Sequence, residues 1–151
     1  MEGVVVKELI VHRDERGELF EILRSDDSLF RNFGQAYITK CFKGWVKGWH
    51  YHRIQWDHFC VIKGKCRIVL YDRREKSSTR GELQEFVFTG AHPRLLSIPA
   101  GVVHGFEAIE GDAWILNIPD RPFNREEPDE HRLSLDSPEV PYEKWKGKKG
   151  W

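Results

Sequence analysis

Short apolar or alternating runs, separated by turn signals, occupy the chain from about residue 4 to residue 118. Strands of a few residues that follow one another at this spacing are typical of an all-β barrel or sandwich. Helix signals are nearly absent from the same region. We expect strands at residues 4–11, 19–23, 35–42, 44–52, 58–62, 66–71, 83–89, 94–98, 103–109 and 113–118.

The segments between these runs carry the residues that tight turns tolerate, namely Gly, Pro, Asp and Ser. They lie at residues 14–17, 63–64, 77–81, 99–101 and 110–112. Most of the strands are therefore expected to be joined by short loops.

The pattern changes after Pro119, where four prolines and many charges follow without a clear period. We expect residues 119–151 to form an irregular C-terminal segment that wraps the barrel. Residues 146–151 are expected to be loose, because chain ends without packing partners usually are. The 151 residues make one domain, with its core at about residues 4–118.

Composition narrows the class of function. The chain is 40% hydrophobic and 13% aromatic, which suits a sizeable buried core. Its 24 Lys and Arg balance 24 Asp and Glu, so no general attraction to nucleic acid or to an anionic membrane is expected. A small molecule is the expected partner, recognised by residues that act locally.

Three cysteines, Cys41, Cys60 and Cys66, are odd in number and lack the spacing of paired zinc or redox ligands. We interpret them as small core residues. The sequence shows neither a signal-peptide pattern nor eighteen consecutive apolar residues, so a cytoplasmic protein is expected.

The densest chemistry is a set of histidines. His50 and His52 project from one face of an expected strand, because side chains alternate along a strand. A short turn can bring Asp57 beside them, and His104 follows the turn at 99–101. Three imidazoles and a carboxylate could bind a divalent transition metal. His58 and His92 are expected to be surface or strand-edge histidines.

The spacing of His50, His52, Asp57 and Gly64 resembles the first cupin motif, with Asp57 in place of the usual Glu. The run from Pro99 to His104 resembles the second motif, although Ala108 stands where that motif has Asn. The resemblance implies a cupin-type β-barrel, or jelly roll, with a small-molecule site lined by histidines.

From about residue 14 to residue 145 the chain also resembles the dTDP-4-dehydrorhamnose 3,5-epimerase family, whose members are dimeric cupins that act on nucleotide-linked keto-sugars. The segments that carry this resemblance are residues 14–21, Gln35, residues 44–51, 72–74, 77–81 and 98–106. It implies a homodimer in which N-terminal strands pack across the interface.

The resemblance also implies how a sugar nucleotide is held. Arg16 and Glu21 match positions that hold the nucleotide, and Gln35 and Lys47 match positions near its phosphates. Lys47 replaces the family's Arg, so it supplies positive charge without the planar two-pronged contact that Arg makes.

For catalysis, His50 matches the family's general base, which removes a proton from the carbon next to the sugar ketone. An imidazole suits this task because its ordinary pKa lies near 6.5. The resemblance implies that His104 stabilises the enolate oxygen. Asp136 is the candidate for the carboxylate that holds the His50 ring.

Two positions depart from the family. Its proton-donating Tyr falls on Leu116, which can neither give nor take a proton, and its pocket Lys falls on or near Asp57, which reverses the local charge. The complete double epimerisation is therefore in question, whereas proton exchange at one carbon needs only His50 and an enolate stabiliser.

Three functions remain open on the sequence. The leading one is an epimerase or isomerase acting on a 4-keto-6-deoxy sugar nucleotide, which requires no cofactor. The second is a metal-dependent cupin enzyme, with the metal held by His50, His52, Asp57 and His104. The third is a sugar-nucleotide-binding protein without catalytic activity.

Overall fold

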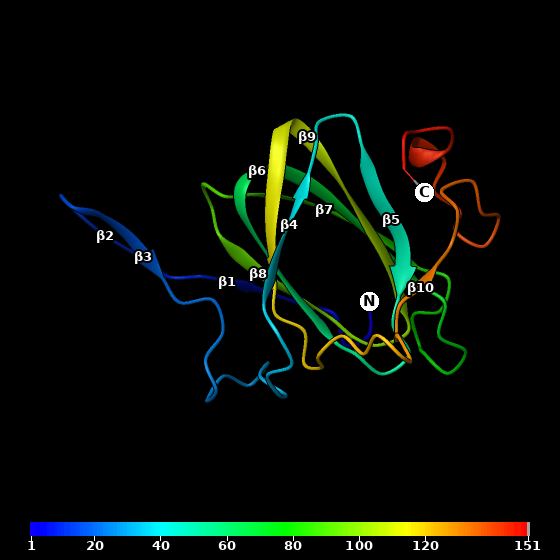
Figure 1. Ribbon diagram of the computed structural model, residues 1–151, viewed down its shortest axis with the longest axis horizontal. Coiled ribbons are helices and arrows are strands. Elements are labelled where there is room, and N and C mark those ends of the chain that lie inside the picture. Colours follow the sequence, from blue (N-terminus) through cyan, green and yellow to red (C-terminus); the bar gives the residue numbers. More distant parts are fainter. Residues whose placement is uncertain (151) are drawn as a thin grey trace.

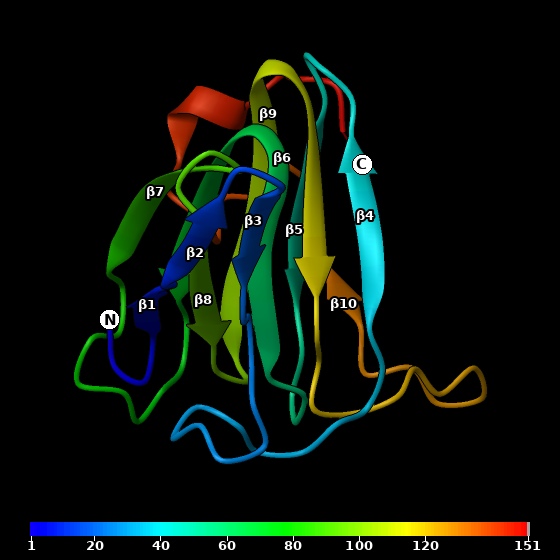
Figure 2. The same ribbon diagram turned by 90° about the vertical axis from the view of Figure 1, so that its left-hand side faces the viewer.

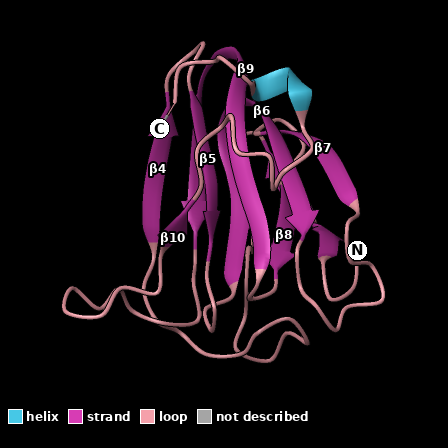
Figure 3. Ribbon diagram, turned by 90° about the vertical axis from the view of Figure 1, so that its right-hand side faces the viewer, coloured by secondary structure: helices cyan, strands magenta, loops and turns pink. Residues whose placement is uncertain are grey.

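The computed structural model describes residues 1–150, and all its regular elements except one short 3-10 helix are β-strands (Figure 3). The strands are β1 (Val5–Glu8), β2 (Val11–Asp14), β3 (Gly17–Phe20), β4 (Tyr37–Cys41), β5 (Val46–Tyr51), β6 (Asp57–Asp72), β7 (Leu83–Thr89), β8 (Arg94–Ile98), β9 (Val102–Asn117) and β10 (His131–Arg132). The helix, η1, spans Glu143–Trp145. The prediction of an all-β protein is confirmed.

Two long strands, β6 and β9, pair with each other over most of their length and link two facing sheets (Figure 1). In the first sheet, β8 pairs with the start of β6 and β4 with the end of β9. In the second, β7 pairs with the later part of β6 and β5 with the start of β9. The chain therefore closes into the cupin-type barrel that the sequence predicted.

The turns predicted at residues 63–64 and 110–112 are wrong, because these residues lie inside β6 and β9. Gly64 and Gly111 have φ values of 76° and 65° there, and the register shifts near Gly64. Glycine reaches this left-handed region without strain, so each strand bends while pairing continues on both sides of the irregularity. By contrast, the strand predicted at residues 94–98 coincides with β8.

The C-terminal segment wraps the barrel as predicted and contributes to a second core cluster beneath β5. Trp145 is fully buried, and its ring centroid lies 4.5 Å from that of Trp49. Its indole N–H donates to the Glu107 carboxylate at 2.8 Å. This hydrogen bond satisfies the polar atom of a ring that is otherwise surrounded by apolar side chains.

The prediction of loose residues at the C-terminal end is wrong for residues 146–150. The backbone N–H of Val46 donates to the carbonyl of Lys149 at 2.8 Å, and the Lys148 ammonium group pairs with the Glu107 carboxylate. These contacts tie the segment to β5 and β9. Trp151, to which the same prediction applied, lies outside the described residues.

The N-terminal strand predicted at residues 4–11 is divided. β1 joins the barrel sheet beside β8, whereas β2 pairs with β3 in a separate hairpin that stands off the barrel (Figures 1 and 2). Leu19 on this hairpin is 60% exposed, and Ile10, just before β2, is 74% exposed. A lone two-stranded hairpin is marginally stable in water, so these exposed apolar side chains form a candidate contact surface.

The three cysteines are buried and unpaired. Within residues 1–150, no helix has the length and apolar character needed to cross a membrane.

Candidate functional site

The second sheet places two histidines face to face. His50 on β5 is the cross-strand partner of His104 on β9, and their ring centroids lie 4.1 Å apart. The two strands approach closely, because a Cβ atom added to Gly48 would lie 2.9 Å from the Cα atom of Gly105. Glycines at both positions allow this approach and bring the imidazoles into contact.

The first sheet contributes Asp57, which opens β6 and is fully buried. Its Oδ2 lies 3.1 Å from Nε2 of His52 and 3.3 Å from Nε2 of His104. Its Oδ1 accepts hydrogen bonds from the side-chain amides of Gln55 and Asn117, each at 2.9 Å. Both oxygens of the carboxylate are thus used, as a buried charge requires.

These contacts set the protonation states of the cluster. Burial alone would raise the pKa of Asp57, but hydrogen bonds from His104 and His52 hold it well below its usual value. Burial alone would lower the pKa of His52, but the hydrogen bond and charge of Asp57 raise it to about 9. Burial, with neighbouring His104 and His52, lowers the pKa of His50 well below its usual value. At neutral pH, His50 is the neutral imidazole beside an ionised His52–Asp57 pair.

Backbone carbonyls bond to the Nδ1 atoms of two of the histidine rings. Nδ1 of His104 bonds to the carbonyl of Val102 at 3.0 Å, and Nδ1 of His52 bonds to the carbonyl of Asp129. The Asp129 carboxylate in turn accepts the backbone N–H groups of residues 53–55, at 2.7, 2.9 and 3.0 Å. The loop after β9 is therefore locked against the loop after β5, and the orientation of His52 is fixed.

The same arrangement fits a metal ion. His52, Asp57 and His104 each offer one ligand atom, and these atoms all lie within 4.8 Å of one another. Metal-binding histidines usually donate their other ring N–H to a carbonyl or a carboxylate, as both rings here do. His50, the fourth predicted ligand, is not part of this group.

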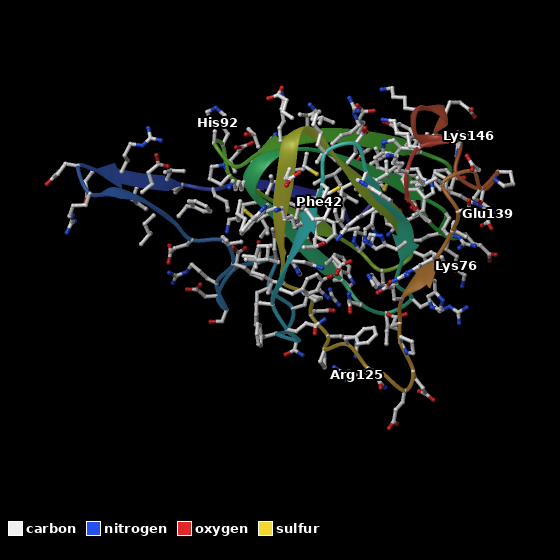
Figure 4. All side chains as sticks on the ribbon, turned by 45° about the horizontal axis from the view of Figure 1, so that its top comes forward. Phe42, Lys76, His92, Arg125, Glu139 and Lys146 are labelled. Carbon is white, nitrogen blue, oxygen red and sulfur yellow. The ribbon has the colours of Figure 1, made fainter. Side chains whose placement is uncertain are left out.

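Two adjoining cavities open beside the cluster. One has a volume of about 240 Å³ and is lined by Tyr37, Thr39, Lys47, His50, His52, Phe59, Phe106, Glu130 and Arg132. The other, of about 510 Å³, is lined by Gln35, Tyr37, His52, Ile54, Gln55, residues 121–124, Glu127, Asp129 and Glu130. The loop that borders the larger cavity carries Arg125 and projects from one end of the barrel (Figure 4).

The structure brings some of the predicted substrate-binding residues to this site and leaves others elsewhere. Lys47 lines the smaller cavity, where its ammonium group donates to Thr39 at 2.8 Å, and Gln35 lines the larger one. Arg16 lies on the projecting hairpin, paired with Asp14, and lines neither cavity of its own chain. Glu21, just beyond the hairpin, is exposed and pairs with Arg24.

Two catalytic assignments change. Asp136 is exposed and accepts the backbone N–H of Gly147 at 2.8 Å, and it lies outside both cavities, so the structure does not place it as the partner of His50. His104 is 1% exposed and lies behind His50, outside the cavity lining, which does not suit direct contact with an enolate oxygen.

Of the two histidines expected at the surface or at a strand edge, His92 is exposed at the turn between β7 and β8 (Figure 4). The expectation for His58 is wrong. His58 is fully buried, where its ring bonds to the carbonyls of Ile118 at 2.9 Å and Leu29 at 3.2 Å. Each ring nitrogen faces a backbone carbonyl, and these polar partners explain why the core accepts the ring.

Sequence reasoning missed Tyr37 and Asn117. Asn117, rather than Leu116, is the residue at the end of β9 that contacts Asp57, and it is the cross-strand partner of Tyr37. Strand alternation held a signal, because buried Ile115 and buried Asn117 share a face that excludes the residue between them. The sequence interpretation took the bend inside β9 for a turn. It therefore did not show which residues at the end of β9 face the interior.

Comparisons with known proteins agree with this geometry. The family model described as polysaccharide biosynthesis C-terminal domain matches residues 12–131. The chain is 39% identical to the spore coat polysaccharide biosynthesis protein SpsL of Bacillus subtilis, over 90% of this chain and 91% of that protein. It is 30% identical to the dTDP-4-dehydrorhamnose 3,5-epimerase of Methanothermobacter thermautotrophicus, over 78% of this chain and 66% of that protein. The solved structure of a dTDP sugar isomerase from Desulfovibrio desulfuricans matches with a TM-score of 0.89 and 34% identity, covering 97% of this chain and 92% of that one.

Proposed function

Because the chain belongs to the polysaccharide biosynthesis family matched above and to the cupin family of dTDP-4-dehydrorhamnose 3,5-epimerases, we propose that it epimerises or isomerises a nucleotide-linked 4-keto-6-deoxy sugar. His50 is the general base that removes the proton next to the ketone. The observation that carries this role is its placement in the wall of the smaller cavity, with a pKa well below the usual value. A neutral imidazole can accept that proton at physiological pH.

Removing the proton creates an enolate, whose negative charge needs a nearby cation or donor. Lys47 and Arg132 line the same cavity as His50 and supply positive charge there. His104 supports the base from behind, through ring contact and through Asp57. In this proposal Lys47 takes part in stabilising the enolate, and His104 positions the base.

The two adjoining cavities suit a ligand with two parts. They share Tyr37, His52 and Glu130, so a sugar in the smaller cavity continues directly into the larger one. Gln35 and Arg121 line the larger cavity and offer a donor and a positive charge to a diphosphate. The nucleotide is therefore assigned to the larger cavity, with its reactive sugar against His50.

We further propose a homodimer. The β2–β3 hairpin leaves its own barrel, and Leu19 on it and Ile10 just before it are exposed, as expected for an arm that packs on a second copy. Such an arm would carry Arg16 and Glu21 toward the partner's nucleotide, where the family resemblance expects them. A cytoplasmic location belongs to the same proposal, because the three cysteines are free thiols.

Metal-dependent catalysis is the second candidate, favoured by the convergence of His52, Asp57 and His104. A divalent ion bound there would supply Lewis-acid polarisation of the ketone oxygen. The side chains of this chain would hold it through two Nε2 atoms and one carboxylate oxygen, with the rings oriented by the carbonyls of Val102 and Asp129.

The proposal is tested by following conversion of dTDP-4-keto-6-deoxyglucose by NMR, with wild type, His50→Gln and His92→Gln. General-base catalysis contributes ~10²–10⁴-fold, so His50→Gln should lose about that factor in rate while its affinity for dTDP stays unchanged. His92→Gln, altered on the exposed turn, should behave as wild type. Equal rates for His50→Gln and wild type would contradict the assignment of the base.

A further inference from the structure

Epimerisation needs a proton donor as well as a base. A base on one face of the enolate returns its proton to the face it came from, so inverting the carbon requires a second acid on the opposite face. The family resemblance placed this acid on Leu116, which has no proton to give. The wall of the smaller cavity nevertheless contains one phenol, Tyr37.

The two sheets present the base and the phenol from opposite sides. His50 belongs to β5, which pairs with the start of β9 in the second sheet. Tyr37 belongs to β4, which pairs with the end of β9 in the first sheet. Both side chains line the same cavity of about 240 Å³. A sugar ring held between the sheets therefore has the imidazole on one side and the phenol on the other.

The hydrogen bonds around Asn117 leave the phenolic proton for a ligand. The Asn117 Oδ1 accepts the backbone N–H of His58 at 3.0 Å, which fixes the orientation of the amide. Its Nδ2 then donates one hydrogen to Asp57 and one to the Tyr37 oxygen, each at 2.9 Å. Within residues 1–150, the Tyr37 hydroxyl accepts this bond and donates none. Its own hydrogen is directed at no protein acceptor in that range.

We propose that Tyr37 is the catalytic acid that protonates the enolate on the face opposite His50, with Asn117 positioning its hydroxyl. This inference rests on the proposed function and adds the residue that determines inversion. Loss of solvation and then the charge of Asp57 raise the pKa of Tyr37 to about 12, so the phenol carries its proton at neutral pH. The acid thus comes from β4, directly across the ladder from Asn117 on β9.

Inversion of the carbon takes two proton transfers. His50 takes the proton from the carbon next to the ketone, and the C–H electron pair moves into the enolate. Tyr37 then gives its O–H proton to the other face of the carbon, which regenerates the ketone with inverted configuration. The imidazolium releases its proton to water and the phenolate takes one from water, so both groups end as they began.

The test separates exchange from inversion. Wild type, Tyr37→Phe and the control Tyr51→Phe are incubated with dTDP-4-keto-6-deoxyglucose in deuterated water, and NMR reads deuterium in recovered substrate and in the inverted product. Tyr51 is a suitable control because it lies on the same strand as His50 but stacks on His131, outside both cavities. Binding of dTDP is measured for each protein by calorimetry.

We expect Tyr37→Phe to bind dTDP and to deuterate the substrate within about tenfold of the wild-type rate, while inversion falls by ~10²–10⁴-fold. Tyr51→Phe should match wild type in both. Inversion by Tyr37→Phe at the wild-type rate would overturn the proposed role of Tyr37 and leave the proposed function standing. Loss of exchange together with inversion, with dTDP binding intact, would also overturn it, because Tyr37 would then act in proton removal. Absence of exchange in wild type would contradict the proposed function itself.

Discussion

The His52–Asp57 pair makes folding stability depend on pH in a window where most side chains do not titrate. The pKa of His52 rises from an ordinary value of 6.5 to about 9 in the folded protein. The folded chain therefore holds a proton that the unfolded chain releases above about pH 6.5. The free energy of unfolding should be highest below that pH and should fall as the pH rises toward 9.

The size of the effect follows from the same values. A rise in the pKa of His52 from 6.5 to about 9 corresponds to about 3 kcal/mol of unfolding free energy, since each pKa unit is worth about 1.4 kcal/mol. His52 is only 8% exposed, so solvent screening removes little of it. His52→Gln cannot hold the proton, and it should be less stable than wild type below pH 6.5 and should change little between pH 6.5 and 9.

The assay is urea unfolding at pH 6, 7.5 and 9, after dialysis against a chelator so that no metal contributes. The unfolding free energies of wild type and His52→Gln should converge near pH 9. The control His92→Gln should have the same stability as wild type at every pH. A wild-type stability that is flat across this window, or an equal slope in His52→Gln, would refute the assignment of a buried ion pair.

Three further outcomes are expected. Trp145→Ala should lower the free energy of unfolding by about 3–5 kcal/mol in a urea titration, because it empties a fully buried site beneath β5. A loss below about 1 kcal/mol would contradict that packing. Leu19→Lys should convert a dimer to a monomer by light scattering, since a charge on the arm opposes its packing on a second copy; a monomeric wild type would end the dimer proposal. Mass spectrometry of the purified protein separates the two catalytic candidates: near-stoichiometric transition metal that His52→Ala removes would favour the metal enzyme, and folded protein that takes up none would exclude it.

Much of the fold was predictable because alternation and turn residues are local signals. The strand at 94–98 coincides with β8, and the HxH pair places His50 and His52 at the site, as period-two geometry requires. The sequence could not show that β6 and β9 run on past Gly64 and Gly111, because a glycine at a bend and a glycine in a turn look alike.

The parts of the site that escaped prediction depend on contacts between distant strands. Tyr37 and Asn117 are 80 residues apart in the chain, and only the pairing of β4 with β9 joins them. The position of Arg16 depends on an arm that leaves its own barrel, which no local pattern reveals. His58 looked like a surface residue because sequence alone does not show that two backbone carbonyls lie beside its ring nitrogens.

In the proposed function, this pocket exchanges a proton on the carbon next to a sugar ketone. The most direct test is to incubate the wild-type protein with dTDP-4-keto-6-deoxyglucose in deuterated water and to read deuterium carbon by carbon by NMR. We expect deuterium at a carbon next to the ketone or, for an isomerase, at the carbon that gains a proton, at a rate that depends on His50. Tight binding of dTDP with no deuterium at any carbon, for this and related keto-sugars, would contradict it and leave a binding protein.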